Sequence, residues 1–477
     1  MTFLEERDLS DVPSIKEYFK GKTIFITGGS GFMGNVLIEK LLFSCTDLER
    51  IYLLLREKKG VKPEDRLAAF YENVLFDRLK REKPGVFETK VVFIGGDISA
   101  PGLGISDEDR ALLINNVNIV FHVAASVRFD DSLDYAATLN LRGTKEMVDL
   151  ATEMVRLESF VHVSTGYSNK NDGRIDEIIY PPHADWRDTI NVCENFDKRT
   201  LEILTPKYLG NSANTYVFTK QLAEHVIYEQ RGKLPIVITR PSIVVSTHSE
   251  PIAGWTANFN GPVGLCIGIG KGLVRTLYAE PNLTSDFIPV DYAIRHFIAA
   301  AWIRGTKKLE ASDEIPVYHC CAGNLKAVTT REVAQIGRNF IFDVPLNDNL
   351  WGVSETLTSN VFIYYLCVIF SHLLPAVFID LILRLLGKKP MLVKIQRRIY
   401  NVQMALKTFT LHQWSFINSN FVKLRSVIKG ADRNEFNYPM EDVDEVEFFR
   451  NSTIGARRFL LKEKDEDYPK ARKQIRL

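Results

Sequence analysis

Cysteine is scarce in this sequence, with 6 among 477 residues, and an excess of one charge is absent, with 60 basic against 59 acidic side chains. The cysteines show no C-x-x-C spacing, so they suggest neither a zinc site nor a disulfide framework and favour a reducing compartment. The near-neutral balance lacks the electrostatic footprint of a nucleic-acid-binding protein. The first residues, MTFLEERDLSDV, are acidic where a secretory signal would be basic and then apolar, so we expect no such signal.

The remaining composition is that of a globular protein, with 45% hydrophobic and 25% charged residues. Apolar runs of strand length alternate with amphipathic stretches of helical length in the first half. The expected strands are residues 22–27, 50–55, 90–95, 118–123, 159–164 and 235–240. This alternation predicts an α/β fold, a Rossmann-type doubly wound parallel sheet with helices on both faces. Further on we expect a helix near residues 292–303, a strand near 316–320 and a helix from Thr330, within a smaller lobe.

A glycine-rich loop follows the first strand and precedes a helical pattern, NVLIEKLLF. Glycines at this position let the backbone approach a pyrophosphate, and the helix directs its N-terminal amides and dipole at the negative charge. The spacing reads as G-x-x-G-x-x-G or as G-x-G-x-x-G, and we predict a dinucleotide site. Its residues are Thr27, Gly28, Gly29, Ser30, Gly31, Phe32, Met33 and Gly34.

Arg56 follows the second strand at the position where an NAD-selecting carboxylate would meet the ribose hydroxyls. A guanidinium there can pair with a 2′-phosphate, so the sequence favours NADP over NAD. Lys58 and Lys59 add positive charge and Glu57 opposes it.

Further cofactor contacts are expected where later strands end. Asp97 and Ile98 follow the third strand, with Asp97 placed toward the adenine. Ala124 and Ala125 follow the fourth, where small side chains leave room for the cofactor, and we interpret the preceding His122 as structural. The expected set is completed by Pro241 and Ile243 in the ITRPSIV segment.

Tyr216 and Lys220 lie one turn apart on one face of an amphipathic helix, NTYVFTKQLAEHVIYEQ. A nearby cation favours the phenolate, so we expect Lys220 to lower the pKa of Tyr216, and Lys220 can also hold the nicotinamide ribose. The fifth strand ends in Ser164 and Thr165, either of which can donate a hydrogen bond to a substrate carbonyl, with Thr165 the first choice. Asn140 is a candidate for a water relay to Lys220, or marks a helix kink.

From residue 356 to 379 no residue carries a formal charge if His372 is neutral, and the run is long enough to consider a membrane span. Two hypotheses remain open: a membrane-associated helical segment and a buried core helix pair. The basic residues that follow suit a phospholipid surface. They are Lys388, Lys389, Lys394, Arg397 and Arg398.

These motifs together resemble the alcohol-forming fatty acyl-CoA reductases, a branch of the extended short-chain dehydrogenase/reductases. The resemblance runs nearly end to end, through FKGKTIFITGGSGFMGNVLIEKLL, VSTGYSN, DEIIYPP, NTYVFTKQLAE, ITRPSIV, EPIAGWTANFNGP and DFIPVDY. The segment from HLLPAVFIDLILRLLGKKP to FTLHQWSF looks like the family's helical C-terminal domain, which nucleotide-sugar epimerases and dehydratases lack. Two departures are Gly166, where many relatives have Ala, and Ala257, in place of a common Asp.

The resemblance implies NADPH-dependent conversion of a long-chain acyl-CoA to a primary alcohol through an aldehyde, in two hydride transfers. Thr165 and Tyr216 would stabilise the oxyanion, Tyr216 would donate the proton, and no cysteine nucleophile is needed. The apolar C-terminal half would line an acyl tunnel or contact the membrane. The implied location is a peroxisomal or endoplasmic reticulum membrane, facing the cytosol. The terminal Ile475, Arg476 and Leu477 match a peroxisomal signal only at the last two positions.

With this resemblance, the sequence divides into four parts: an N-terminal extension (1–20), an NADP-binding reductase domain (21–350) whose substrate lobe begins near residue 241, a helical domain (351–465) and a polar tail (466–477). Two other functions remain open. One is an extended short-chain reductase acting on a sterol or another bulky carbonyl compound. The other is a non-catalytic, membrane-associated scaffold that binds acyl-CoA.

Overall fold

The computed structural model describes residues 12–56, 60–61, 63–169, 174–259, 261–308, 310, 313–340, 343–350, 352 and 356–475. The chain forms two compact units whose segments alternate along the sequence. The first unit comprises Met1–Ser242, Ile288–Ala322 and Phe416–Pro439. The second unit comprises Ile243–Phe287, Gly323–Ser415 and Met440–Leu477.

The first unit contains a seven-stranded sheet in the order β11-β6-β5-β4-β1-β2-β3, in which every neighbouring pair is parallel. The order reverses direction between β1 and β4, which creates the switch point where doubly wound sheets bind ligands at their carboxyl ends. The strands are β1 (Thr23–Thr27), β2 (Arg50–Leu55), β3 (Val91–Gly95), β4 (Ile119–His122), β5 (Ser159–Val163), β6 (Ile236–Pro241) and β11 (Val317–Cys320).

The predicted fold class and all six predicted strands of the first half are confirmed, with ends that agree to within one residue. These strands read as apolar runs because helices cover both faces of a parallel sheet. The strand expected near residues 316–320 is also present, but as β11 it joins the main sheet beside β6. The chain therefore returns to the sheet after residue 287.

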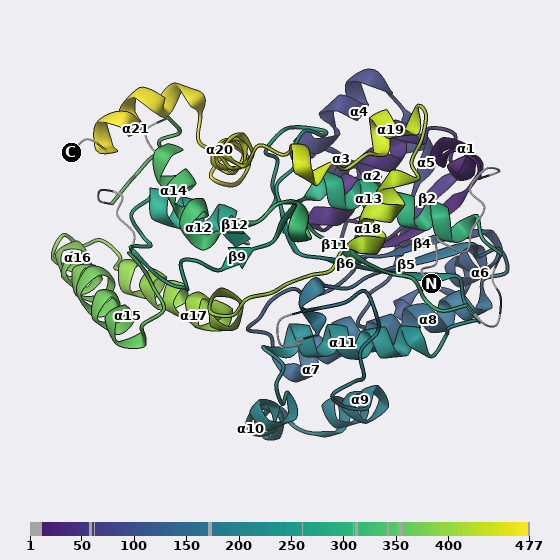
Figure 1. Cartoon of the computed structure of the whole chain (residues 1–477), viewed down its shortest axis with the longest axis horizontal. Coiled ribbons are helices and arrows are strands. Elements are labelled where there is room, and N and C mark those ends of the chain that lie inside the picture. The colour runs from purple at the N-terminus through teal and green to yellow at the C-terminus, as the bar shows by residue number, and fades with distance from the viewer. Residues whose placement is uncertain are drawn as a thin grey trace. The chain divides into compact units, whose positions relative to one another are not determined.

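Figure 1 shows α2 and α13 on one face of this sheet and α8 and α11 on the other. The helices of the first unit are α1 (Ile15–Phe19), α2 (Phe32–Ser44), α3 (Pro63–Tyr71), α4 (Asp77–Glu82), α5 (Val86–Lys90), α6 (Asp107–Asn116), α7 (Leu133–Ala136), α8 (Gly143–Glu153), α9 (Trp186–Asn195), α10 (Lys198–Tyr208), α11 (Thr215–Tyr228), α13 (Val290–Gly305), α18 (Ser419–Ser426) and α19 (Asp432–Phe436). Its short turns are η1 (Val74–Phe76), η2 (Pro101–Gly104), the π-helical η3 (Ala137–Arg142) and η4 (Gly166–Ser168).

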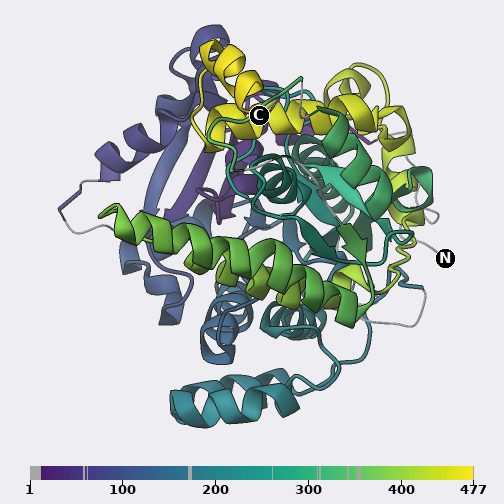
Figure 2. The same ribbon diagram turned by 90° about the vertical axis from the view of Figure 1, so that its left-hand side faces the viewer.

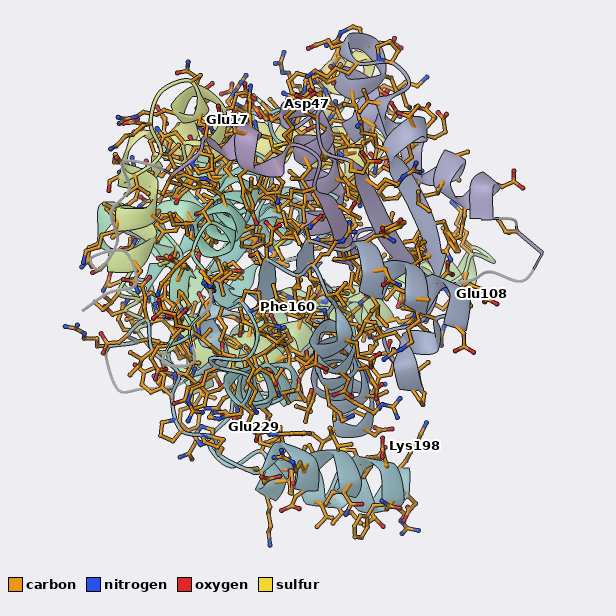
Figure 3. The ribbon with its side chains drawn as sticks, turned by 90° about the vertical axis from the view of Figure 1, so that its right-hand side faces the viewer. Glu17, Asp47, Glu108, Phe160, Lys198 and Glu229 are labelled. Carbon is orange, nitrogen blue, oxygen red and sulfur yellow. The ribbon has the colours of Figure 1, made fainter. Side chains whose placement is uncertain are left out.

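In this unit large apolar side chains are buried in the core, and most charged side chains lie at the surface. Phe160 of β5 has no exposed surface and packs in the cluster between the sheet and its helices. Figure 3 shows Phe160 in the interior, whereas Glu108 and Lys198 lie at the periphery. Apolar burial of this extent is the main stabilising contribution to such a sheet.

The second unit is mostly helical. Its helices are α12 (Gly261–Gly270), α14 (Thr330–Phe340), α15 (Val361–Cys367), α16 (Leu374–Leu385), α17 (Leu392–Thr410), α20 (Glu445–Gly455) and α21 (Tyr468–Ile475). The short strands β7 (Ile243–Val245), β8 (Thr276–Tyr278), β9 (Thr284–Ser285), β12 (Val328–Thr329) and β13 (Thr356–Thr358) also belong to it, and β10 (Phe287–Pro289) lies at the boundary. Its turns are η5 (Gly323–Leu325), η6 (Val368–Leu373), η7 (Met440–Asp442), η8 (Ala456–Leu460) and η9 (Asp465–Asp467).

α15, the π-helical η6 and α16 join into one helix, Val361–Leu385, which Figure 2 shows as a long green rod beside α17. By length and composition alone it could cross a membrane. Only 17% of its most apolar window is buried. Of the two hypotheses for this segment, the buried core helix pair is therefore wrong, because most of the apolar surface faces outward.

Candidate active site

The glycine loop lies at the sheet's switch point, between the ends of β1 and β4. Gly28 has a φ of +74°, and a Cβ there would lie 2.6 Å from the backbone nitrogen of Ala124. A Cβ on Gly34 would lie 2.3 Å from the carbonyl oxygen of Gly28. Only glycine fits at these two positions, because neither contact can give way without moving backbone.

The start of α2 is prepared for an anion. Gly31 is its N-cap and supplies no side-chain acceptor to the first amides, and the first turn carries no acidic residue. Ser30 and Gly31 are exposed, while Phe32 and Met33 are half-buried. The positive end of a thirteen-residue helix is suited to hold a pyrophosphate.

His122 at the end of β4 ties the loop to the sheet. Its Nδ1 lies 2.8 Å from the hydroxyl of Thr27, and its Nε2 lies 3.1 Å from the hydroxyl of Thr144. The Thr144 hydroxyl donates to the carbonyl of Asn140, so it accepts from His122. Burial lowers the pKa of His122 to about 3, and the neutral ring serves as a structural link.

Arg56 and Asp97, at the ends of β2 and β3, form an ion pair in which Nε lies 3.0 Å from Oδ2. Burial raises the pKa of Asp97, but hydrogen bonds from Ser99 and the charge of Arg56 outweigh burial and bring the pKa below its usual value. More than half of the Arg56 side chain remains exposed. Residues 57–59, including the two lysines considered above, lie outside the described residues.

Of the remaining cofactor residues predicted from the sequence, only some lie at this edge of the sheet. Ala124 and Ala125 are half-buried and directly follow β4. Ile98 is buried against Gly143 of α8. Pro241 ends β6, whereas Ile243 begins β7 in the second unit.

Thr165, Tyr216 and Lys220 converge where β5 ends beside α11. The hydroxyl of Thr165 lies near the phenol of Tyr216 and lowers the pKa of that phenol. The ammonium of Lys220 donates to the carbonyl of Val163, two residues before Thr165, at 2.7 Å. Asn214 caps α11 by accepting from the amide of Val217, which fixes the turn that carries the tyrosine.

The expected effect of Lys220 on the phenol is wrong for this geometry. Burial raises the pKa of Tyr216 to about 12, and the hydrogen bond from Thr165 lowers it only partly. Burial also lowers the pKa of Lys220 to about 8, with Glu224 opposing. The ammonium is directed at the Val163 carbonyl, so desolvation governs the phenol, which is protonated at neutral pH.

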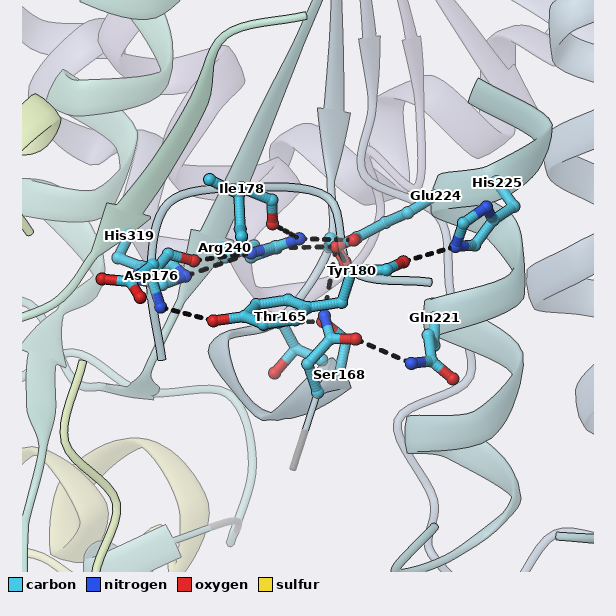
Figure 4. Close-up of polar contacts among 12 residues, drawn as sticks. Thr165, Ser168, Asp176, Ile178, Tyr180, Gln221, Glu224, His225, Arg240 and His319 are labelled. Carbon is cyan, nitrogen blue, oxygen red and sulfur yellow. Dashed lines mark hydrogen bonds and ion pairs between the residues drawn. The ribbon is translucent and has the colours of Figure 1, made fainter. Parts of the chain in front are cut away.

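Ser164 does not join this group. Its hydroxyl donates to Oε1 of Glu224 at 2.5 Å, deeper in the unit, which leaves Thr165 as the hydroxyl beside the phenol. Figure 4 shows Glu224 at the centre of a polar network that includes Arg240 and His319. The guanidinium of Arg240 donates to both carboxylate oxygens, at 2.9 and 2.7 Å, and also contacts Nε2 of His319 at 3.2 Å.

Sequence reasoning missed the Glu224–Arg240 pair, although both residues lie in segments it singled out. Glu224 is one turn beyond Lys220, and Arg240 ends the predicted strand 235–240. A charged residue in a strand buried on both faces requires a partner, which is the signal that could have found the pair.

Asn140 lies in η3, so it does mark an irregular helix. Its amide group donates to the carbonyl of Ser126 and the hydroxyl of Thr219, and its oxygen accepts from the Ser126 amide. These bonds connect η3 to α11, the helix of the tyrosine. The relay to Lys220 stays a prediction.

Gly166 follows Thr165 in η4, and its missing side chain has a packing role. A Cβ there would lie 3.1 Å from Cε1 of Phe416, in the segment that returns to the first unit. Phe416 packs edge-on against Tyr167, with ring centres 5.2 Å apart. The turn beside Thr165 is therefore closely packed.

A doubly wound sheet with a glycine loop at its switch point and a Tyr-x-x-x-Lys helix beside a threonine defines an extended short-chain-type reductase. The solved structures agree on this fold. The chain superposes on the reductase domain of a nonribosomal peptide synthetase from Mycobacterium tuberculosis with a TM-score of 0.62, 18% identity and coverage of 94% of each chain. The terminal reductase domain of the myxalamid PKS-NRPS pathway gives a TM-score of 0.59, 18% identity and coverage of 92% and 90%.

Two family models described as male sterility protein match residues 26–297, as an NAD-binding domain, and residues 371–463. Fatty acyl-CoA reductase 1 of Xenopus laevis is 38% identical over 97% of this chain and 89% of its own length, and that of Homo sapiens is 37% identical with the same coverage. Fatty acyl-CoA reductase wat of Drosophila melanogaster is 35% identical over 98% of this chain and 89% of its length. The chain belongs to the fatty acyl-CoA reductase family, and its first unit has a nicotinamide dinucleotide-binding fold.

Proposed function

We propose that this chain reduces long-chain fatty acyl-CoA to a primary fatty alcohol and CoA, with NADPH as the reductant and an aldehyde as the intermediate. The observation that carries the proposal is that Thr165 and Tyr216 lie close together, one turn from the buried Lys220, on a sheet whose switch point holds the glycine loop. Family membership supports the acyl-CoA substrate.

The loop fits a dinucleotide on structural grounds, because a side chain at Gly28 or Gly34 would collide with backbone. The N-terminal end of α2 would hold the pyrophosphate, and Arg56 would pair with the 2′-phosphate of NADPH. Bound NADPH supplies a hydride in each of two successive reductions, and the oxidised cofactor is exchanged between them.

The side chains of the chain manage the oxygen atom and its proton. In the first reduction the hydroxyls of Thr165 and Tyr216 donate hydrogen bonds to the thioester oxygen as the carbonyl carbon is reduced. The tetrahedral product collapses, the C–S bond breaks, and CoA leaves as a thiolate that takes up a proton from water. An aldehyde remains.

In the second reduction the aldehyde carbon is reduced and its oxygen takes a proton from Tyr216, which gives the alcohol. A phenol with a pKa of about 12 is protonated at neutral pH and is a proper donor to an alkoxide, which is much more basic. Lys220, one turn along α11 from Tyr216, would hold the ribose of the bound cofactor. The overall conversion consumes two NADPH and two protons for each alcohol and CoA formed.

We also propose that the chain works at an intracellular membrane, peroxisomal or endoplasmic reticulum and facing the cytosol, which it reaches through its C-terminal helical region. The exposed apolar helix Val361–Leu385 supports membrane association. A long-chain acyl-CoA partitions to membranes, so a membrane location brings enzyme and substrate together.

The direct test is to incubate purified protein with NADPH and a series of acyl-CoAs and to identify the lipid products by mass spectrometry. We expect fatty alcohol with long chains and little product with short ones. Turnover of a sterol or another bulky carbonyl compound in preference to every acyl-CoA would replace the proposal with the alternative reductase. Tight acyl-CoA binding without NADPH oxidation would replace it with the acyl-CoA-binding scaffold.

A further inference from the structure

The helix Val361–Leu385 has an apolar row that runs along its full length. The row is formed by Phe362, Leu366, Phe370, Leu374, Phe378 and Leu385, all of which are exposed, with Phe362 at 76% and Leu385 at 80%. A helix of this length extends roughly 37 Å. Exposed apolar patches of this size mark a surface that binds something.

The opposite side of the same helix is buried and carries its polar residues. Tyr364 is fully buried, as are nearly all of His372 and Asp380. His372 Nδ1 lies 2.8 Å from Oε1 of Gln396 on α17, and its Nε2 accepts from the amide of Arg275 at 3.2 Å. The helix is thus polar on the inside and apolar on the outside.

Asp380 fixes the far end of the helix to α17. Its carboxylate accepts from the amides of Met391, Leu392 and Val393, each at 2.9 Å. A carboxylate that accepts three amides at a helix start is a strong cap. The helix is therefore fastened to the second unit at His372 and again at Asp380.

These attachments decide between crossing a membrane and lying on it. A crossing helix would take α17 with it, because the two are joined at both points. α17 exposes Lys394, Arg397 and Arg398, and charged residues inside hydrocarbon are costly. A helix immersed on one side only keeps its polar side on the protein and its apolar row in lipid.

The basic residues around the helix favour an anionic lipid. Between residues 356 and 410 the sequence has seven basic side chains and one acidic side chain, Asp380. Asp380 is buried and used in the cap, whereas Arg384, Lys388 and Lys389 are exposed directly after the apolar row. Each basic residue near an anionic membrane surface adds to binding.

We propose that the helix Val361–Leu385 lies flat in one leaflet of an anionic phospholipid membrane, with its apolar row among the acyl chains and the neighbouring basic residues on the headgroups. This inference rests on the membrane association in the proposed function and specifies its geometry and its lipid. It does not depend on the reaction, because the surface involves none of the residues assigned to chemistry or cofactor.

The first experiment measures binding of the full chain to phosphatidylcholine vesicles with and without phosphatidylserine, in the absence of NADPH and acyl-CoA. We expect binding to increase at least about tenfold with phosphatidylserine. Phe370→Glu combined with Phe378→Glu should abolish binding to both. Ile203→Glu, on an equally exposed apolar residue of α10, is the matched control and should bind normally.

A second variant distinguishes the contribution of the lipid headgroups to binding from that of the acyl chains. Arg397→Glu combined with Arg398→Glu should remove the preference for phosphatidylserine and leave weak binding to phosphatidylcholine. Equal binding of the unchanged chain to both vesicles would overturn the lipid assignment. Self-association through the apolar row, seen as a dimer that the double Phe variant dissolves and that binds no vesicle, would overturn the proposal as a whole.

The geometry is tested by labelling two positions that flank the helix, Ser359→Cys and Lys389→Cys, on protein bound to sealed vesicles, with the unsubstituted chain as background. Both cysteines should react with a membrane-impermeant maleimide added outside. Protection of one of them until the vesicles are opened would show a crossing helix and contradict the proposal. Because binding is measured without turnover, an inactive but vesicle-bound protein would refute only the proposed reaction.

Discussion

The sheet edge of the first unit and the apolar helix of the second unit distribute polarity in opposite ways. The ion pair of Glu224 on α11 and Arg240 on β6 is at most 1% exposed, and its oxygen and nitrogen atoms are hydrogen-bonded. In the helix Val361–Leu385 large apolar side chains face outward, whereas His372 and Asp380 face inward. The first pattern holds a reaction site in a fixed geometry, and the second suits contact with lipid.

The largest expected effect is on turnover, which depends on the first of these two regions and not on the second. Tyr216→Phe removes the proposed proton donor, and we expect kcat for alcohol formation to fall at least about a thousandfold, since general acid catalysis contributes roughly 10²–10⁴. NADPH binding, followed by fluorescence, and vesicle binding should be unchanged. Thr165→Val tests the partner hydroxyl in the same assay. Undiminished turnover by Tyr216→Phe would refute the mechanism.

The buried ion pair gives the next largest effect. Glu224→Gln leaves Arg240 with an uncompensated buried charge, and we expect the free energy of unfolding to fall by about 3 kcal/mol, measured by denaturant unfolding. Glu229→Gln breaks the exposed pair with Arg187, whose distance is 2.6 Å against 2.7 Å in the buried pair, and should cost under about 1 kcal/mol. Equal costs would mean that burial does not distinguish the two pairs.

Acid should weaken the first unit through its buried neutral histidines. Burial lowers the pKa of His122, His296 and His319 to about 3, from 6.5. Because the unfolded chain binds protons that the folded chain does not, their contribution is complete above pH 6.5 and is lost as the pH falls toward 3.

At pH 5 each of these histidines should lower the free energy of unfolding by about 2 kcal/mol relative to pH 8. His296→Phe should therefore narrow the difference in unfolding free energy between pH 8 and pH 5 by about that amount. The exposed His183→Phe is the control and should not change it. An unaltered acid slope in His296→Phe would contradict the assignment.

The smallest effect concerns cofactor choice. Arg56→Ala removes the proposed partner of the 2′-phosphate, and we expect the ratio of kcat/KM for NADPH over NADH to fall about tenfold, through KM for NADPH. Arg50→Ala, at the exposed start of the same strand, is the control. A ratio that stays the same would assign the 2′-phosphate to other residues.

Much of the fold could be predicted because its signals are local. The six strands of the first half are apolar runs with clear ends, and the glycine loop stands directly between a strand and a helix. The position of Thr165 at the end of β5 followed from the same logic, since parallel strands bring their carboxyl ends to one edge of the sheet.

What could not be predicted depends on contacts between distant segments. Nothing in the pattern of residues 416–439 shows that they return to the first unit, where Phe416 packs on the turn after Thr165. The direction of the pKa shift of Tyr216 was predicted wrongly because sequence spacing places Lys220 nearby but does not show that its ammonium is directed at Val163. The Glu224–Arg240 pair likewise joins a helix to a strand sixteen residues away.

The most direct test of the central proposal is the stoichiometry of a complete turnover: NADPH oxidised, CoA released and alcohol formed from one long-chain acyl-CoA, measured in the same sample. The Thr165–Tyr216–Lys220 site predicts two NADPH for each CoA and each alcohol. One NADPH for each CoA, with aldehyde as the final product, or no CoA release at all, would contradict it.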